Sequence, residues 1–201
     1  VDLLRRPEQP ETLSFGAVVH EAIELWYTLP ADGHRLLAIL DFIDSRYPNR
    51  GVDAREKAAW HLARAIIIGY AERYVREEFD VVHVEKEFEA EIRNPETGRP
   101  SQTFTIAGKV DGIVRVEDEL YLLEHKTAST IDGEYLEKLW MDFQLLLYAY
   151  ALEKHCDLRI AGVIYNILVK AKLRQGQGET EEEFRQRAAE LAAKNKTGKT
   201  T

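Results

Sequence analysis

The spacing of apolar and polar positions changes near residue 80 of the chain. Before that point apolar residues recur every three to four positions, which predicts amphipathic helices. We expect three helices, over 14–28, 35–46 and 53–78. Ser14 and Asp53 stand where the first and third helices should begin, and both residue types are favoured as helix caps.

After residue 80 apolar positions alternate with polar ones. Between Val82 and Ile92 every second residue is His or Glu, and this period of two predicts a strand. The expected elements are strands over 81–92, 103–116, 120–126 and 160–169, a helix over 134–154, and a final helix over 179–193 that Thr180 would cap. The strand over 160–169 is strongly apolar, as expected inside a sheet.

The order of these elements predicts an α/β fold with a small mixed sheet flanked by helices. A length of 201 residues suits one domain. Within it we expect a helical section over 1–79, an α/β core over 80–170 that carries the chemistry, and a polar tail over 171–201. The chain begins at Val1 rather than Met, so we expect a piece of a longer protein.

Composition narrows the class of protein. Cys156 is the single cysteine, which excludes an internal disulfide and a site built on several cysteines. No apolar run reaches the roughly 18 residues of a membrane helix, and a cytoplasmic location is expected. The net charge of -8 disfavours binding of DNA by bulk electrostatics, but it suits a carboxylate metal site.

The candidate chemistry lies on the second and third expected strands, which carry Asp111 and the pair Glu124 and Lys126. Adjacent antiparallel strands lie about 4.8 Å apart, so two carboxylates could hold one ion. Glu124 and Lys126 are two apart and share a face. A bound ion acidifies water and polarises a phosphoryl oxygen, while a lysine offsets negative charge. The alternative is a structural network of ion pairs across the hairpin.

Three further features bear on that choice. Gln144 and Tyr148 share a helix face and could order the lysine or contact a phosphate; otherwise they form a polar edge beside the apolar stripe of Phe143, Leu146, Leu147 and Tyr150. His20 lies near the apolar face of the first helix, where a core histidine is the alternative to a ligand. Glu85 faces the Asp111 strand, but its alternating neighbours suggest a solvated edge.

Together these residues resemble the PD-(D/E)xK nuclease superfamily, in its RecB-like branch. The motifs occur in the family's order: Gly16 to His20, Glu85, Gly108 to Asp111, Glu124 to Lys126, and Gln144 to Tyr148. The resemblance covers about residues 14–169 and implies a restriction-endonuclease-like core. The chain lacks the cysteines of the iron–sulfur members and is similar to stand-alone nucleases of phage or prophage type.

The resemblance also assigns roles. It implies that Asp111, Glu124 and His20 bind the metal together with the backbone carbonyl of His125, whose side chain should point to packing or solvent. Lys126 is the implied catalytic lysine, and Gln144 and Tyr148 support the site and the DNA. Magnesium or manganese suits such oxygen ligands better than zinc does.

The function expected is a Mg²⁺- or Mn²⁺-dependent deoxyribonuclease, an exonuclease of recombination or repair that acts on DNA. A homo-oligomer or a recombination partner protein is the expected assembly. One alternative is a nuclease-like fold that binds DNA or assembles without catalysis, and another is an unrelated domain with a structural polar network. Two side features stay open: Lys170, Lys172 and Arg174 are a phosphate patch or a solvated loop, and Trp140 and Tyr135 stack on bases or, more often for such residues, pack in the core.

Overall fold

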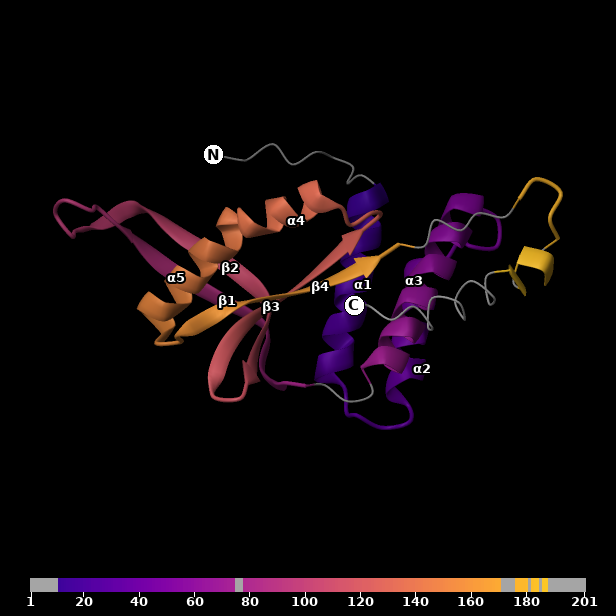
Figure 1. Ribbon diagram of the computed structural model, residues 1–201, viewed down its shortest axis with the longest axis horizontal. Coiled ribbons are helices and arrows are strands. Elements are labelled where there is room, and N and C mark those ends of the chain that lie inside the picture. The colour runs from indigo at the N-terminus through magenta and orange to yellow at the C-terminus, as the bar shows by residue number, and fades with distance from the viewer. Residues whose placement is uncertain (1–10, 75–77, 171–175, 181, 185, 188–201) are drawn as a thin grey trace. The chain divides into compact units, whose positions relative to one another are not determined.

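The computed structural model describes residues 11–74, 78–170, 176–180, 182–184 and 186–187 (Figure 1). Residues 1–170 form one compact unit and residues 171–201 form another. The elements of the first unit are α1 (Glu11–Thr28), α2 (Arg35–Arg46), α3 (Ala54–Arg73), β1 (Asp80–Arg93), β2 (Pro100–Val116), β3 (Glu119–Ala128), α4 (Gly133–Trp140), α5 (Phe143–Cys156) and β4 (Ile160–Val169). The expected mixed α/β architecture is therefore confirmed.

The three N-terminal helices pack on one another around a core of their own. Asp53 caps α3 as expected, because its carboxylate accepts hydrogen bonds from the backbone N–H groups of Arg55 and Glu56 at 2.7 and 3.3 Å. Two expected boundaries are wrong: α1 begins at Glu11, so Ser14 lies inside the helix, and α3 ends at Arg73 rather than at residue 78. The buried side chains are Phe15, Val18, Val19, Ala22, Ile23, Trp26, Ile39, Leu40, Ile43, Tyr47, Ala63, Ile67 and Tyr70.

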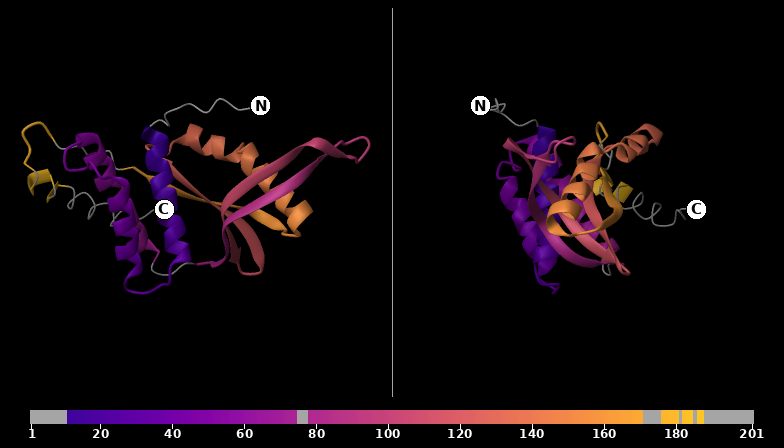
Figure 2. Two further views of the ribbon diagram at one scale, coloured as in Figure 1. Left: turned by 180° about the vertical axis from the view of Figure 1, so that it is seen from behind. Right: turned by 90° about the vertical axis from the view of Figure 1, so that its left-hand side faces the viewer.

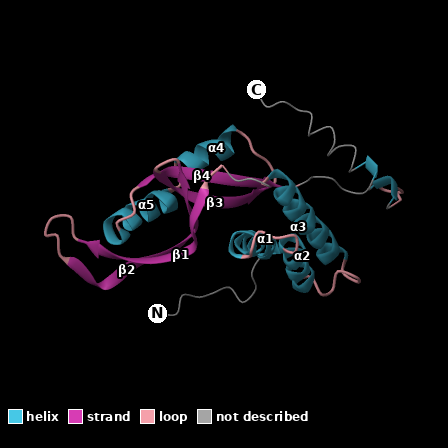
Figure 3. Cartoon of the chain, turned by 90° about the horizontal axis from the view of Figure 1, so that it is seen from below, coloured by secondary structure: helices cyan, strands magenta, loops and turns pink. Residues whose placement is uncertain are grey.

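The sheet has the strand order β1-β2-β3-β4. β2 runs antiparallel to both β1 and β3, whereas β4 pairs with β3 in parallel. A parallel pair needs a crossover, and α4 and α5 form it. In Figure 3 these two helices lie along the strands, whereas α1, α2 and α3 form a separate group.

The sheet divides into two arms where the β2–β3 pairing stops. The last paired residues are Gly112 and Leu123. Beyond them β2 stays paired with β1 out to Pro100, and β3 stays paired with β4 out to Ala128. The β1–β2 hairpin therefore projects away from the other two strands, as Figure 2 shows. This fork is the feature of the fold that positions the candidate site.

The helix expected over 134–154 is in fact two helices, α4 and α5, which meet at Met141 and Asp142. In a continuous helix the carbonyl of Leu139 would accept from the backbone N–H four residues later. Here it accepts instead from the Tyr165 hydroxyl on β4 at 3.1 Å and from the N–H of Asp142 at 3.3 Å. Contacts with a distant strand thus override a local pattern that favours one long helix.

The second core lies between the sheet and α5, and α5 buries a different face from the one expected. Its buried residues are Leu145, Ala151 and Leu152. Of the expected apolar stripe, Phe143, Leu146 and Tyr150 are all exposed. Trp140 is also exposed, which contradicts the expectation that it packs in the core.

The structure describes the second unit over residues 176–180, 182–184 and 186–187. There Glu183 donates its backbone N–H to the Thr180 hydroxyl at 3.3 Å, and its carboxylate accepts from the N–H of Thr180 at 2.8 Å. This reciprocal capping box confirms that Thr180 caps a helix, while most of the expected helix lies outside the described residues. Lys172 and Arg174 also lie outside them, whereas Lys170 sits over the ring of Phe15. Within the described part of the chain, no helix combines the length and apolar character needed to cross a bilayer.

Candidate active site

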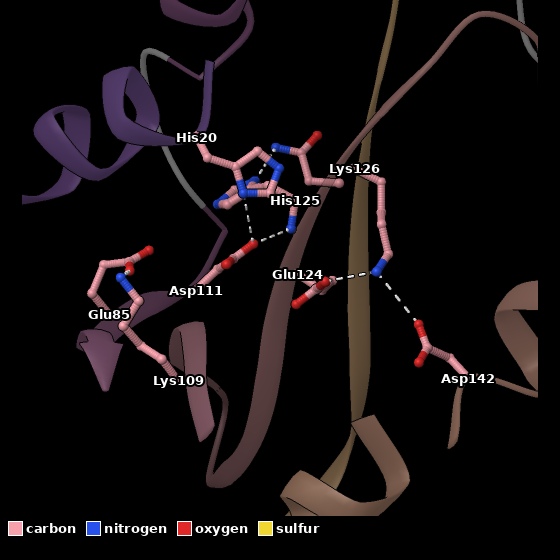
Figure 4. Close-up of polar contacts among 9 residues, drawn as sticks. His20, Glu85, Lys109, Asp111, Glu124, His125, Lys126 and Asp142 are labelled. Atoms are coloured by element: carbon pink, nitrogen blue, oxygen red, sulfur yellow. Dashed lines mark hydrogen bonds and ion pairs between the residues drawn. The ribbon is translucent and has the colours of Figure 1, made fainter. Parts of the chain in front are cut away.

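Asp111 and Glu124 are the first residues past the end of the β2–β3 pairing, so they lie at the point of the fork where the two strands separate. Figure 4 shows the Glu124 carboxylate between Asp111 and Lys126. Both carboxylates are largely buried, with 18% and 13% of their side-chain surfaces exposed. Two acidic groups so placed require compensating positive charge or hydrogen bonds.

Asp111 is held from two directions. Its Oδ2 atom accepts a hydrogen bond from the backbone N–H of His125 at 2.8 Å, and the Nδ1 atom of His20 on α1 lies 3.6 Å away. Burial raises the pKa of Asp111, but the His20 ring and the His125 N–H outweigh it and leave that pKa below its usual value. The pKa of His20 shifts upward. Burial lowers this pKa, but the hydrogen bond and the charge of the Asp111 carboxylate raise it by more.

Glu124 and Lys126 form an ion pair on the same strand, with the lysine Nζ atom 2.7 Å from the Glu124 Oε1 atom. Burial is the main cause of a raised Glu124 pKa, and the charge of Asp111 adds to it. A second carboxylate, that of Asp142 at the junction of α4 and α5, lies 3.4 Å from the Nζ atom of the same lysine. Burial lowers the Lys126 pKa, but the bond to Glu124 outweighs it and the net shift is upward.

Glu85 lies across from Asp111, because the pairs on either side of it join Val84 to Gly112 and Lys86 to Val110. Its side chain forms an ion pair with Lys109. The backbone of Glu85 has a φ of 48°, a left-handed conformation that costs a non-glycine residue about 1–2 kcal/mol. The expected solvated edge is confirmed for Glu87, Glu89 and Glu91, which are exposed, whereas the Glu85 carboxylate is largely covered, with 19% of its side-chain surface exposed.

The side chain of His125 points away from the fork into a buried network. Of the two environments expected for it, packing and solvent, the structure therefore shows packing. Its ring is stacked on Tyr27 with centroids 6.0 Å apart, and its Nδ1 atom lies 3.1 Å from the Asn166 amide nitrogen. Burial lowers the His125 pKa to about 4. The ring is therefore neutral at pH 7 and anchors the strand whose backbone N–H holds Asp111.

Gln144 and Tyr148 form a unit on α5, where the Gln144 amide donates to the Tyr148 hydroxyl at 2.9 Å. The Tyr148 ring packs edge-on against Phe88, with centroids 5.0 Å apart. It also lies over the backbone of Gly108, where an added Cβ atom would come within 2.6 Å of the ring. The glycine that precedes Asp111 by three positions is thus required by the close approach of the tyrosine.

Replacing Gly108 by alanine should reduce the free energy of unfolding by about 1–3 kcal/mol, as overpacked cores do. Gly69 on α3 offers the matched control, because a Cβ atom there meets nothing within 4 Å. Gly69→Ala should stabilise by about 0.5–1 kcal/mol, the usual gain inside a helix. Urea unfolding followed by circular dichroism measures both, and equal effects of the two variants would contradict the packing argument.

The sequence as a whole matches the family model described as the PD-(D/E)XK nuclease superfamily, over residues 1–200. The chain belongs to that superfamily. The expected family is therefore confirmed, and with it a nuclease with a restriction-endonuclease-like core. Nucleases of this superfamily generally use divalent metal ions.

Relatives of this nuclease include one of the subunits of the ATP-dependent helicase/nuclease of Streptococcus agalactiae, in strains of serotypes Ia, V and III. Each is 29% identical over 86 residues, which covers 43% of this chain. The chain spans 7% of the length of each relative. This distant similarity to helicase/nuclease proteins is consistent with the RecB-like branch.

The donor set of the nuclease fits a metal ion that keeps part of its water shell. Among the residues that the structure describes, no group of three or more His, Cys, Asp or Glu side chains is placed to hold a metal ion by itself. Two carboxylates, Asp111 and Glu124, meet at the fork close enough for one to raise the pKa of the other. Magnesium is commonly held by one or two carboxylates with waters and phosphates, so these residues suit it.

The fold assembles most of the expected site and adds one residue. His20, Asp111, Glu124 and Lys126 come together from α1, β2 and β3. Gln144 and Tyr148 bond each other, and the partner of Lys126 from the helical side is Asp142. Sequence reasoning missed Asp142 because it sits inside a segment that favours one continuous helix, and no periodic signal marks it.

Proposed function

We propose that this nuclease is a metal-dependent deoxyribonuclease that hydrolyses phosphodiester bonds with Asp111, Glu124 and Lys126. The observation that carries the proposal is the placement of these three side chains at the fork, where β2 and β3 separate. A structural ion-pair network would need no opening between the strands. Here the two carboxylates lie past the last paired residues and the lysine lies 2.7 Å from one of them.

In the proposed mechanism Asp111 and Glu124 would hold the ion, with His20 and the His125 backbone carbonyl as further candidate ligands. The ion would supply an acidified water and a polarised phosphoryl oxygen. The water oxygen would bond to phosphorus and release a proton to the solvent, while the bond to the leaving sugar oxygen breaks and that oxygen takes up a proton from the solvent. No covalent bond to the enzyme forms.

The protein's own groups prepare this step. The backbone N–H of His125 fixes the orientation of Asp111. The Lys126 ammonium stands where it can offset the negative charge that builds on the phosphate. Asp142 limits the positions open to that lysine, since it contacts the same Nζ atom from the other side. Gln144 and Tyr148 are proposed to support the site and to contact the DNA backbone.

The proposal extends to an exonuclease of recombination or repair that uses Mg²⁺ or Mn²⁺. Its support is the RecB-like order of motifs and the similarity to relatives named helicase/nuclease subunits. A cytoplasmic location and a homo-oligomer or a recombination partner belong to the same proposal.

End-labelled linear DNA and closed circular DNA, each incubated with Mg²⁺, Mn²⁺ or EDTA, test this function. We expect loss of the linear substrate with either metal, protection by EDTA, and slower attack on the circle. A Glu124→Gln variant purified in parallel serves as control against a contaminating nuclease. Metal-independent cleavage, or equal cleavage by the variant, would sink the proposal, and equal rates on both substrates would replace the exonuclease by an endonuclease.

A further inference from the structure

The ammonium group of Lys126 contacts two carboxylates that lie in different directions from it (Figure 4). The Glu124 Oε1 atom on the same strand lies 2.7 Å from the Lys126 Nζ atom, and the Asp142 Oδ2 atom lies 3.4 Å from it. Glu124 is a proposed ligand of the metal ion, so its carboxylate would share its negative charge with that ion. Asp142 is the partner of the lysine that this binding leaves unchanged.

The carboxylate of Asp142 does not serve its own helix, although it stands where an aspartate normally caps one. Asp53 and Asp132 do cap helices, because their carboxylates accept hydrogen bonds from backbone N–H groups in the first turns of α3 and α4. The side chain of Asp142, at the start of α5, makes no such bond. It contacts Lys126 instead, with 18% of its surface exposed. The chain therefore forgoes a helix cap here and keeps the carboxylate at the active site, and such exceptions are expected at functional sites.

Tyr165 on β4 ties the junction that carries Asp142 to the sheet. The Tyr165 hydroxyl donates to the Leu139 carbonyl at 3.1 Å, and the backbone N–H of Asp142 donates to the same oxygen at 3.3 Å. The tyrosine ring is partly buried against the core between the sheet and α5. One carbonyl of α4 thus connects a residue anchored in the sheet with the residue that contacts the lysine.

The pairing of β3 with β4 places this tyrosine beside the active site. In the register of the two strands Tyr165 pairs with Glu124, and the next residue but one pairs with Lys126. Because side chains alternate between the faces of a sheet, Tyr165 leaves it on the same side as Glu124 and Lys126. Burial raises the pKa of the Tyr165 hydroxyl and the charge of Asp142 raises it further, so the hydroxyl keeps its proton and stays a donor.

We propose that the Tyr165 hydroxyl is a positioning group that fixes Asp142, and that Asp142 keeps the Lys126 ammonium at the fork while the metal ion is bound. This inference rests on the proposed function and adds a residue to it. A cation held by Glu124 would repel the ammonium group, and a fixed carboxylate on another side opposes that displacement. In this role Tyr165 contacts neither the ion nor the phosphate and acts only through the lysine.

Tyr165→Phe removes the hydroxyl and keeps the ring. We expect single-turnover cleavage with Mg²⁺ to slow about three- to tenfold, the effect of losing one hydrogen bond. The affinities for DNA in EDTA and for Mn²⁺ should stay at the parent values, because the hydroxyl touches neither. Tyr121→Phe is the matched control: the Tyr121 hydroxyl also bonds a neighbour, the Glu119 carboxylate at 3.0 Å, but at the exposed start of β3. It should cleave at the parent rate.

The decisive measurement repeats Tyr165→Phe in a Lys126→Ala background. A residue that acts through the lysine has nothing left to position there, so the second substitution should not slow cleavage further. A general loosening of the fold would instead slow both backgrounds by the same factor.

Labelling of lysines with acetic anhydride, measured by peptide mass spectrometry, follows the ammonium group without relying on cleavage. With Mg²⁺ present, Tyr165→Phe should raise the acetylation of Lys126 severalfold over the parent. Lys57, which is exposed on α3, is the internal reference and should be labelled equally in both proteins.

Three outcomes would overturn the inference: a parent-like cleavage rate of Tyr165→Phe, an equal loss of rate in the two backgrounds, or unchanged acetylation of Lys126. Each of them leaves the proposed function standing as long as Glu124→Gln abolishes metal-dependent cleavage. A parent chain that does not cleave DNA with Mg²⁺ or Mn²⁺ ends both proposals.

Discussion

Asp111→Asn should lower the rate of DNA cleavage by about three orders of magnitude or more while the protein stays folded. A bound ion contributes several kcal/mol of transition-state stabilisation, and each 1.36 kcal/mol corresponds to a factor of about ten in rate. The asparagine keeps an oxygen that can accept from the His125 N–H, which Asp111 does at 2.8 Å. The substitution therefore removes the negative charge needed by a cation and preserves the bond that orders the strand.

Single-turnover cleavage at saturating Mg²⁺ measures the rate, and thermal unfolding measures the fold. Asp118→Asn is the control, because Asp118 is exposed in the turn between β2 and β3, on the same hairpin. It should cleave at the parent rate. Cleavage by Asp111→Asn within tenfold of the parent would remove Asp111 from the ligands. A collapse of the melting temperature together with activity would make its role structural.

Lys126→Ala should lower the cleavage rate about 10²–10³-fold, the range found when one donor to a developing anion is removed. The lysine contacts two carboxylates, Glu124 at 2.7 Å and Asp142 at 3.4 Å, so its ammonium group is held at the fork. Metal binding should survive, because neither carboxylate at the fork is altered. Isothermal calorimetry with Mn²⁺ tests that part, and quenched-flow cleavage tests the rate.

Lys138→Ala supplies the control for this variant, because Lys138 also pairs with a glutamate but lies on the surface of α4. Its removal should leave the rate unchanged, as exposed ion pairs contribute little. The cleavage rate of Asp142→Asn should lie between the rates of these two variants, since Asp142 acts on the lysine and not on the phosphate. If Lys126→Ala and Lys138→Ala cleave alike, Lys126 has no catalytic role.

The elements of this nuclease could be predicted from the sequence because their periodicity is local. The alternation that predicted strands over 81–92 and 103–116 corresponds to β1 and β2, and the apolar run over 160–169 is β4. A strand that buries one face repeats every two residues and a helix every three to four, whatever the rest of the chain does. Asp111, Glu124 and Lys126 followed from the same logic, as charged residues inside buried strands.

What only the tertiary structure decided depends on contacts between distant segments. The fork between β2 and β3 has no marker in either strand, and it sets where Asp111 and Glu124 stand. At the break between α4 and α5 the Tyr165 hydroxyl on β4 donates to the Leu139 carbonyl, a contact that joins residues 26 apart. That same break leaves Trp140 and Phe143 exposed, although the local pattern favours their burial. Periodicity determines which residues form a face, but the packing of other elements determines whether that face is covered.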